Sequence, residues 1–176
     1  MWADDGAIFF SEALNHGLTS IVFPYAGSFH TVQRLIVMFV VYCLPVSLWA
    51  HAVAFISTGI FMVVAAQFGR KEYAWLVPSV RGRYCTVALL CFTPGLNEMM
   101  GNVANLNWIF LLWLVLIFLK DPTLKITVPE TLLSLALVLS VGTSVLLIPL
   151  ILWRLFETRS QKMPNTFYKA PLLLLS

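Results

Sequence analysis

The stretch that decides the fold is residues 35–68, LIVMFVVYCLPVSLWAHAVAFISTGIFMVVAAQF, which contains no acid, lysine or arginine. As one α-helix this stretch would be about 51 Å long, whereas the hydrocarbon core of a bilayer is roughly 30 Å thick. A proline in a helix interior removes a backbone hydrogen bond and bends or ends the helix. Pro45 therefore predicts a partly embedded helix from about Thr31 to Leu44 and a full span from about Val46 to Phe68.

The composition extends this interpretation to the whole chain. Hydrophobic residues make up 60% of the 176 residues and charged residues 11%, and the mean hydropathy is +0.87. These values exclude an ordinary soluble domain, and no stretch alternates with the period of a membrane barrel strand. The sequence predicts an all-α fold, a polytopic protein of the inner (plasma) membrane with short half-span helices. The lipid bilayer is an expected partner, and the net charge of +3 is no signal of nucleic-acid binding.

Several later apolar runs are too short to cross a bilayer comfortably. Residues 84–96 and 106–119 would each be roughly 20 Å long as helices. The polar connector between them, which contains Glu98, is therefore expected in a recessed, outward-facing cavity. Residues 126–153 are either one span or two half-length helices with a break at Ser140–Ser144. The break is favoured because it keeps the following bases on the same side as the earlier ones.

Lysine and arginine in short loops bias those loops to the cytoplasm. This rule places five bases inside, namely Arg70, Lys71, Lys120, Arg154 and Lys162, and it places the N-terminus and Glu98 outside. Residues 1–34 are then an outer-face polar segment, and residues 35–176 are the multispanning membrane domain. Because the last residues, 170–176, begin another apolar run, we expect the chain to be a fragment of a longer protein.

The polar opening, residues 1–34, holds three of the eight acids in a chain that is otherwise mostly apolar. A short helix is expected from Ala7 to about Asn15, ended by Gly17. The sequence Pro24–Gly27 predicts a turn, because proline fixes one backbone dihedral and glycine allows a positive one. We expect this turn to bring Tyr25 and His30 to the membrane surface.

The candidate catalytic residues are Asp4, Asp5 and Glu98, with Asp5 and Glu98 as the preferred pair. Carboxylates in a recessed cavity can act as general bases or hold a divalent metal ion, the cofactor that such a site would take. Structural alternatives remain open, because one aspartate can be a helix cap and Glu98 can be paired. The candidates for substrate contacts are His30, Arg34, Tyr25 and Asn102. Structural roles are also open to three of them, because His30 can be an ordinary loop histidine, Arg34 can extend to the membrane interface, and Asn102 can form a turn.

Five segments together resemble bacterial multispanning glycosyltransferases of the GT-C type: Trp2–Gly6, Phe23–Gly27, His30–Leu35, Asn97–Glu98 and Gly101–Trp108. The resemblance implies transfer of a sugar from a polyprenyl-phosphate donor on the outer face of the membrane. It also implies that an acid of the first outer loop, here Asp4 or Asp5, is the catalytic base or metal-binding group, assisted by Glu98. Such enzymes have a membrane span before that loop and several spans after the point that corresponds to the end of this sequence, so the chain resembles an N-terminal part only.

Three functions stay open from the sequence. The first is a partial sugar transferase using a polyprenyl-phosphate donor, and the second is a non-catalytic membrane subunit that binds polyprenyl lipids. The third is a transporter fragment, in which the break at Gly142 would form a substrate site between two half-helices. A carrier of protons or ions is expected to have acids within its spans, whereas the acids here lie in loops or at span ends. This pattern favours the first two functions.

Overall fold

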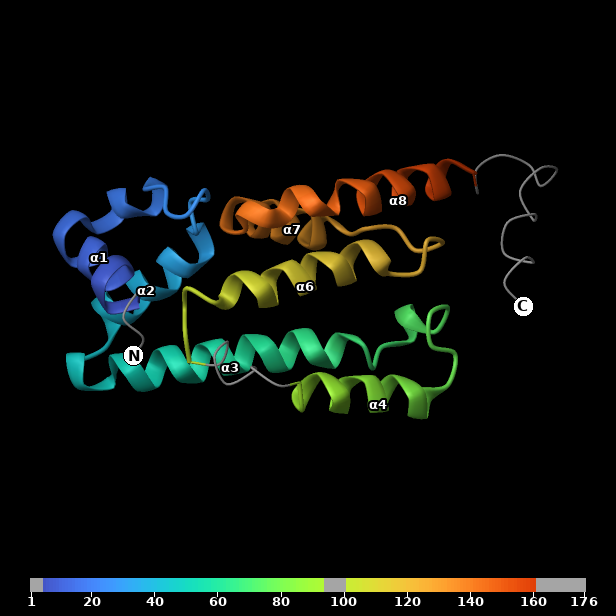
Figure 1. Cartoon of the computed structure of the whole chain (residues 1–176), viewed down its shortest axis with the longest axis horizontal. Coiled ribbons are helices and arrows are strands. Elements are labelled where there is room, and N and C mark those ends of the chain that lie inside the picture. Colours follow the sequence, from blue (N-terminus) through green and yellow to red (C-terminus); the bar gives the residue numbers. More distant parts are fainter. Residues whose placement is uncertain (1–4, 94–100, 161–176) are drawn as a thin grey trace.

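The computed structural model describes residues 5–93 and 101–160, without the side chains of residues 5 and 158–160. This part of the chain is all-helical and has no strand, which confirms the predicted fold class (Figure 1). In chain order its helices are η1 (Asp5–Phe10), α1 (Ser11–His16), η2 (Gly17–Val22), α2 (Thr31–Cys43), η3 (Val46–Leu48), α3 (Trp49–Gln67), η4 (Lys71–Tyr73), α4 (Val80–Cys91), α6 (Leu106–Leu119), α7 (Val128–Ser140), η5 (Gly142–Leu147) and α8 (Ile148–Ser160).

The predicted division at Pro45 is confirmed. Helix α2 ends at Cys43, Leu44 and Pro45 are extended, and the helix restarts as η3 and α3. The combined segment Val46–Gln67 is 22 residues long and is the only helix in the described ranges that is long and apolar enough to cross a membrane. Helices α2, α6 and α7 are apolar but shorter. Repeated crossing of a membrane therefore remains a prediction.

The predicted break near Gly142 is also present. Helix α7 ends at Ser140, and after η5 the chain turns back as α8 (Figure 1). Both α7 and α8 pack on α6, and α8 carries Arg154 back to the loop that precedes α7, where its Nη2 donates to the carbonyl of Leu124 at 2.7 Å. Residues 126–153 are therefore a hairpin of two short helices.

The N-terminal part folds over the start of α2. Gly17 ends α1 with a φ of +56°, as the sequence predicted. The turn lies one residue later than predicted, because Tyr25 and Ser28 exchange backbone hydrogen bonds of 2.8 and 3.0 Å. Its central residues, Ala26 and Gly27, both have positive φ. This arrangement brings the turn beside the break between α7 and η5, where a Cβ on Gly142 would lie 3.3 Å from the Gly27 carbonyl oxygen.

The core lies between α2, α3 and α6, while many large apolar side chains face outward on α3, α4, α7 and α8. The apolar runs that contain Cys43, Cys85 and His51 predict buried side chains at these three positions, and this prediction is wrong. Cys43 and Cys85 are exposed, and His51 is exposed near the start of α3. The reason is that these helix faces have no packing partner among the described helices.

Candidate functional site

A buried polar cluster lies where the N-terminal part meets the start of α2. His30, Gln33 and Arg34 are 2%, 0% and 2% exposed. The interpretation that placed His30 and Arg34 on a surface segment is therefore wrong. Phe9 of η1 covers both side chains, because the ends of η1 and α1 pack their apolar face on α2.

The guanidinium group of Arg34 links three segments. It forms an ion pair with Glu12 of α1, its Nε donates to the Phe29 carbonyl at 3.0 Å, and its Cζ lies 5.3 Å from the centre of the Phe9 ring. Its Nη2 is buried and finds no acceptor among the described residues. A buried charge is costly unless it is paired and hydrogen-bonded, so Arg34 holds α1 against α2 with one donor unused.

His30 precedes the first residue of α2 in a left-handed conformation, with a φ of +51°. Its ring contacts Phe9 and Tyr25, with centroid distances of 5.5 and 5.6 Å. The backbone of Tyr25 lies near the ring, but neither ring nitrogen meets hydrogen-bond geometry with a described residue. Burial lowers the pKa of His30, the Tyr25 backbone partly opposes this, and the charge of Arg34 lowers it further. The imidazole is therefore neutral at pH 7.

Gln33 connects this cluster to two helices far away in the sequence. Its Nε2 donates to Oδ1 of Asn107 in α6 at 2.6 Å and more weakly to the Ser140 carbonyl at 3.5 Å. The neighbouring Val32 N–H donates to the Ser140 hydroxyl at 2.9 Å. Because Asn107 uses Oδ1 to accept from Gln33, its Nδ2 group is the part of the amide left to donate elsewhere.

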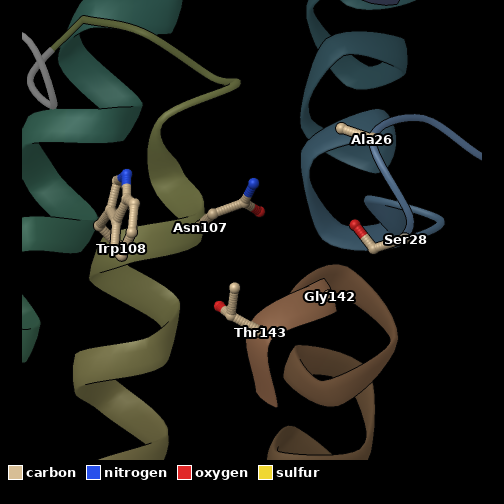
Figure 2. Close-up of a pocket in the computed structure, with 6 residues that line it drawn as sticks. All are labelled: Ala26, Ser28, Asn107, Trp108, Gly142 and Thr143. Carbon is tan, nitrogen blue, oxygen red and sulfur yellow. The ribbon is translucent and has the colours of Figure 1, made fainter. Parts of the chain in front are cut away.

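A small pocket lies beside Asn107. Its volume is about 130 Å³, and it is lined by Ala26, Ser28, Asn107, Trp108, Gly142 and Thr143. Figure 2 shows the Asn107 side chain pointing from α6 toward the turn, with Ser28 and Thr143 on either side of the gap below it. Two hydroxyls, one amide and one indole surround the space, and among the described residues no acid or base lines it. Such a set suits a neutral group that carries hydroxyls.

A second charged cluster lies at the opposite end of the helices, and its members are fully engaged. Lys120 contacts Glu130 at 2.9 Å and Glu72 at 3.8 Å, and Arg70 contacts Glu72 at 2.8 Å. Arg154 donates to the carbonyls of Lys120, Asp121 and Leu124. Arg70, Lys120 and Arg154, which the sequence assigned to one side of a membrane, thus gather at one end of the molecule, while Lys162 lies outside the described residues.

The pKa values of Tyr73 and Glu130 reflect the burial and hydrogen bonding at this end. Burial raises the pKa of Tyr73 to about 12, and its hydroxyl donates to the Leu116 carbonyl at 3.1 Å. Burial alone would raise the pKa of Glu130, but hydrogen bonds from Thr127 and Lys120 outweigh it and the pKa is lowered. Thr127 and Glu130 also form a capping box at the start of α7. We interpret this cluster as structural.

The predicted catalytic acids fall mostly outside the part that the structure describes. Asp4 and Glu98 lie outside the described residues, and Asp5 begins η1 without a described side chain. Of the predicted substrate contacts, His30, Arg34 and Tyr25 do come together, around Phe9.

Asn102 is buried, and its Oδ1 accepts from the Asn105 N–H at 3.3 Å, as expected of a turn residue. The sequence interpretation missed Glu12, Gln33 and the pocket residues Ser28 and Thr143, whereas it named the break at Gly142 as the substrate site of a transporter. For Glu12 a local signal existed, because it lies three residues after Phe9 on the same helix face. The pairing of Gln33 with Asn107 has no local signal.

No group of three histidines, cysteines or acids close enough to hold a metal ion occurs within residues 5–93 and 101–160. The expected divalent ion would rest on Asp4, Asp5 and Glu98, and none of these three side chains is among those that the structure describes. Comparison of the chain with models of protein families, with curated proteins and with solved structures finds no match.

Proposed function

We propose that the chain is part of a membrane-embedded, glycosyltransferase-like protein that binds a polyprenyl-phosphate sugar on the outer face of the inner membrane. The observation that carries this proposal is the pocket beside Asn107, with its hydroxyls, its amide and Trp108. Sugars present hydroxyls that donate and accept, together with C–H faces that pack on aromatic rings. The two hydroxyls and the amide of the pocket can hydrogen-bond with sugar hydroxyls, and the Trp108 ring can pack on a C–H face. None of the described lining residues is charged.

The surroundings of the pocket support a lipid-linked ligand. Trp108 is 54% exposed at the start of the apolar helix α6, so one side of the pocket adjoins an apolar surface. Gln33 connects Asn107 to the segment that carries Arg34, whose Nη2 is unused. A phosphate is the kind of group that a guanidinium binds best. We propose that Arg34 and His30 support the phosphate-bearing part of the donor when α1 moves away from α2.

In this proposal Asp5 and Glu98, with Asp4 as an alternative, take the proton of the acceptor hydroxyl or hold a divalent ion against the donor phosphate.

One observation favours a second candidate, a non-catalytic subunit that binds polyprenyl lipids. Glu12, the acid that the structure does describe at this end, is engaged by Arg34 and is not free to act as a base.

The pocket is tested by removing single hydroxyls. Thr143→Val keeps the shape of the side chain, and Ser28→Ala removes the other hydroxyl. Loss of one hydrogen bond is expected to weaken binding of the polyprenyl-phosphate sugar by about three- to tenfold, without changing binding of the same polyprenyl phosphate lacking the sugar. Thr131→Val, on the exposed side of α7, is the matched control. Equal binding of the sugar-bearing lipid by all variants would remove the pocket from the proposal.

Catalysis is tested separately by measuring sugar transfer in membranes that contain the complete protein. Replacing an essential base usually lowers the rate by roughly a hundred to ten thousandfold. Asp5→Asn and Glu98→Gln are therefore expected to abolish transfer while donor binding persists. Transfer near the unmodified rate for Asp4→Asn, Asp5→Asn and Glu98→Gln, all well expressed, would instead support the non-catalytic subunit.

A further inference from the structure

Three exposed bases lie at the end of the molecule opposite the pocket. Lys71 is in η4, Arg81 is in the first turn of α4, and Lys125 is in the loop before α7. The charged side chains of these three residues form no ion pair or hydrogen bond with a described residue. They are thus unlike Lys120 and Arg154, which are buried and engaged at the same end.

Backbone contacts bring the segments that carry these bases together. The Asp121 N–H donates to the Glu72 carbonyl at 2.9 Å, which joins the loop before α7 to η4. Arg83 donates to the carbonyls of Val77 and Gly69 at 2.9 and 3.4 Å, which joins the start of α4 to the residues that flank η4. In Figure 1 all three segments lie at the end of the helices away from α1.

The neighbouring acids offset the three bases only in part. Glu72 is bound by Arg70 and Lys120, and Glu130 is bound by Lys120 and the Thr127 backbone. Asp121 accepts from the hydroxyl and the backbone N–H of Thr123, and these hydrogen bonds lower its pKa and keep it ionised. The described side chains of this end nevertheless include more bases than acids, so positive charge at Lys71, Arg81 and Lys125 is left for something outside the described chain.

Two exposed tryptophans, Trp75 and Trp153, form an aromatic pair at this end of the molecule. Trp75 stacks on Trp153 with a centroid distance of 5.8 Å, and its Nε1 donates to the Leu119 carbonyl at 3.0 Å. Both indoles remain exposed, at 40% and 36%. Tryptophans with one bonded edge and one apolar face gather at the interface between headgroups and hydrocarbon. Exposed apolar side chains continue from this pair along α8.

We propose that this end of the molecule docks on the phosphates of anionic phospholipids, with Lys71, Arg81 and Lys125 as the contacts and Trp75 and Trp153 at the edge of the hydrocarbon. Basic clusters next to an apolar helix surface bind anionic headgroups in this way. A lipid surface is favoured over an acidic protein because the aromatic pair and the apolar helix faces adjoin the bases. The inference is independent of the pocket at the other end.

The test uses the full chain in nanodiscs of phosphatidylcholine, to which a fluorescent phosphatidylglycerol is added. A triple variant, Lys71→Gln, Arg81→Gln and Lys125→Gln, removes the charge. The matched triple variant, Lys71→Arg, Arg81→Lys and Lys125→Arg, retains it. We expect the first to lose affinity for phosphatidylglycerol by about fivefold for each base removed at low salt, and the second to keep it.

Retained preference for phosphatidylglycerol in the glutamine variant, or equal binding of phosphatidylglycerol and phosphatidylcholine by the unmodified chain, would overturn the proposal. Equal lipid binding together with salt-sensitive binding of polyglutamate would favour an acidic protein instead. Because the assay contains no sugar donor, Thr143→Val, which tests the pocket, is expected to leave the affinity for phosphatidylglycerol unchanged.

Discussion

The two ends of the molecule each bury an arginine, but they bury it differently. The guanidinium group of Arg154 donates to the backbone carbonyls of Lys120, Asp121 and Leu124. Arg34 has one acid and one carbonyl, and its Nη2 is buried without an acceptor in the described chain. The donors of Arg154 hold the loop between α6 and α7 together, whereas at Arg34 one buried donor, Nη2, stays without an acceptor in the described chain.

The difference indicates which end is built for stability and which is available for a ligand. Buried polar groups in folded proteins are nearly always hydrogen-bonded, so groups that are not need an explanation. His30 and Gln33 add three more unpartnered buried atoms beside Arg34. None of the buried side-chain atoms found without a partner in the described residues belongs to the Lys120 and Arg154 end. This contrast supports the proposal, which rests on the pocket beside Asn107, that the phosphate-bearing part of the ligand lies at the Arg34 end.

The largest expected effect comes from Arg154→Met. The substitution leaves several loop carbonyls without their donor, and we expect a loss of about 4 kcal/mol in the free energy of unfolding, measured by thermal denaturation in detergent. Arg81→Met, at an exposed position, is the control and should change stability by less than about 0.5 kcal/mol. Similar small losses for both variants would remove the distinction between the two ends.

Glu12→Gln tests the other arginine. It leaves the charge of Arg34 buried without its acid, so we expect a loss of about 3 kcal/mol. Arg34→Met should cost less, because the Glu12 side chain is 28% exposed and can be hydrated. The double variant should be less destabilised than the sum of the two single variants. Additive losses would mean that the ion pair does not hold α1 against α2.

His30 makes the Arg34 end sensitive to acid. Its pKa is lowered in the folded state, so the unfolded chain binds more protons as the pH falls below about 6.5, and stability is lost in that direction. We expect His30→Phe to reduce this acid-dependent loss in unfolding experiments between pH 7.5 and 5. His51→Phe, at an exposed position, is the control. An unchanged pH profile in the His30 variant would show that its ring is not confined as described.

The smallest effect concerns a local feature of the engaged end. Thr127→Ala removes the capping box that begins α7, which should cost about 1 kcal/mol. Thr127→Ser keeps the hydroxyl and should restore most of the loss. Hydrogen exchange of the first turn of α7 would locate the effect. Protection that is unchanged in the alanine variant would contradict a role for this cap.

Local chemistry made much of the fold predictable from the sequence. Pro45 ends one helix because it lacks an N–H, and Gly17 ends another because it accepts a positive φ. The apolar run 106–119 coincides with α6, and small and polar residues mark the break between α7 and η5. The turn was misplaced by one residue, because a positive φ at Ala26 contradicts what its side chain prefers.

The sequence alone therefore determined the all-helical class and the helix ends at Gly17 and Pro45, and it favoured the hairpin at Gly142 over a single span, because each depends on residues a few positions apart. Only the tertiary structure decided that His30 and Arg34 are buried, that Glu12 pairs with Arg34, and that Gln33 meets Asn107 across 74 positions. These pairings depend on how helices pack, which leaves no periodicity or spacing in the sequence. A buried charge finds its partner only once the chain has folded.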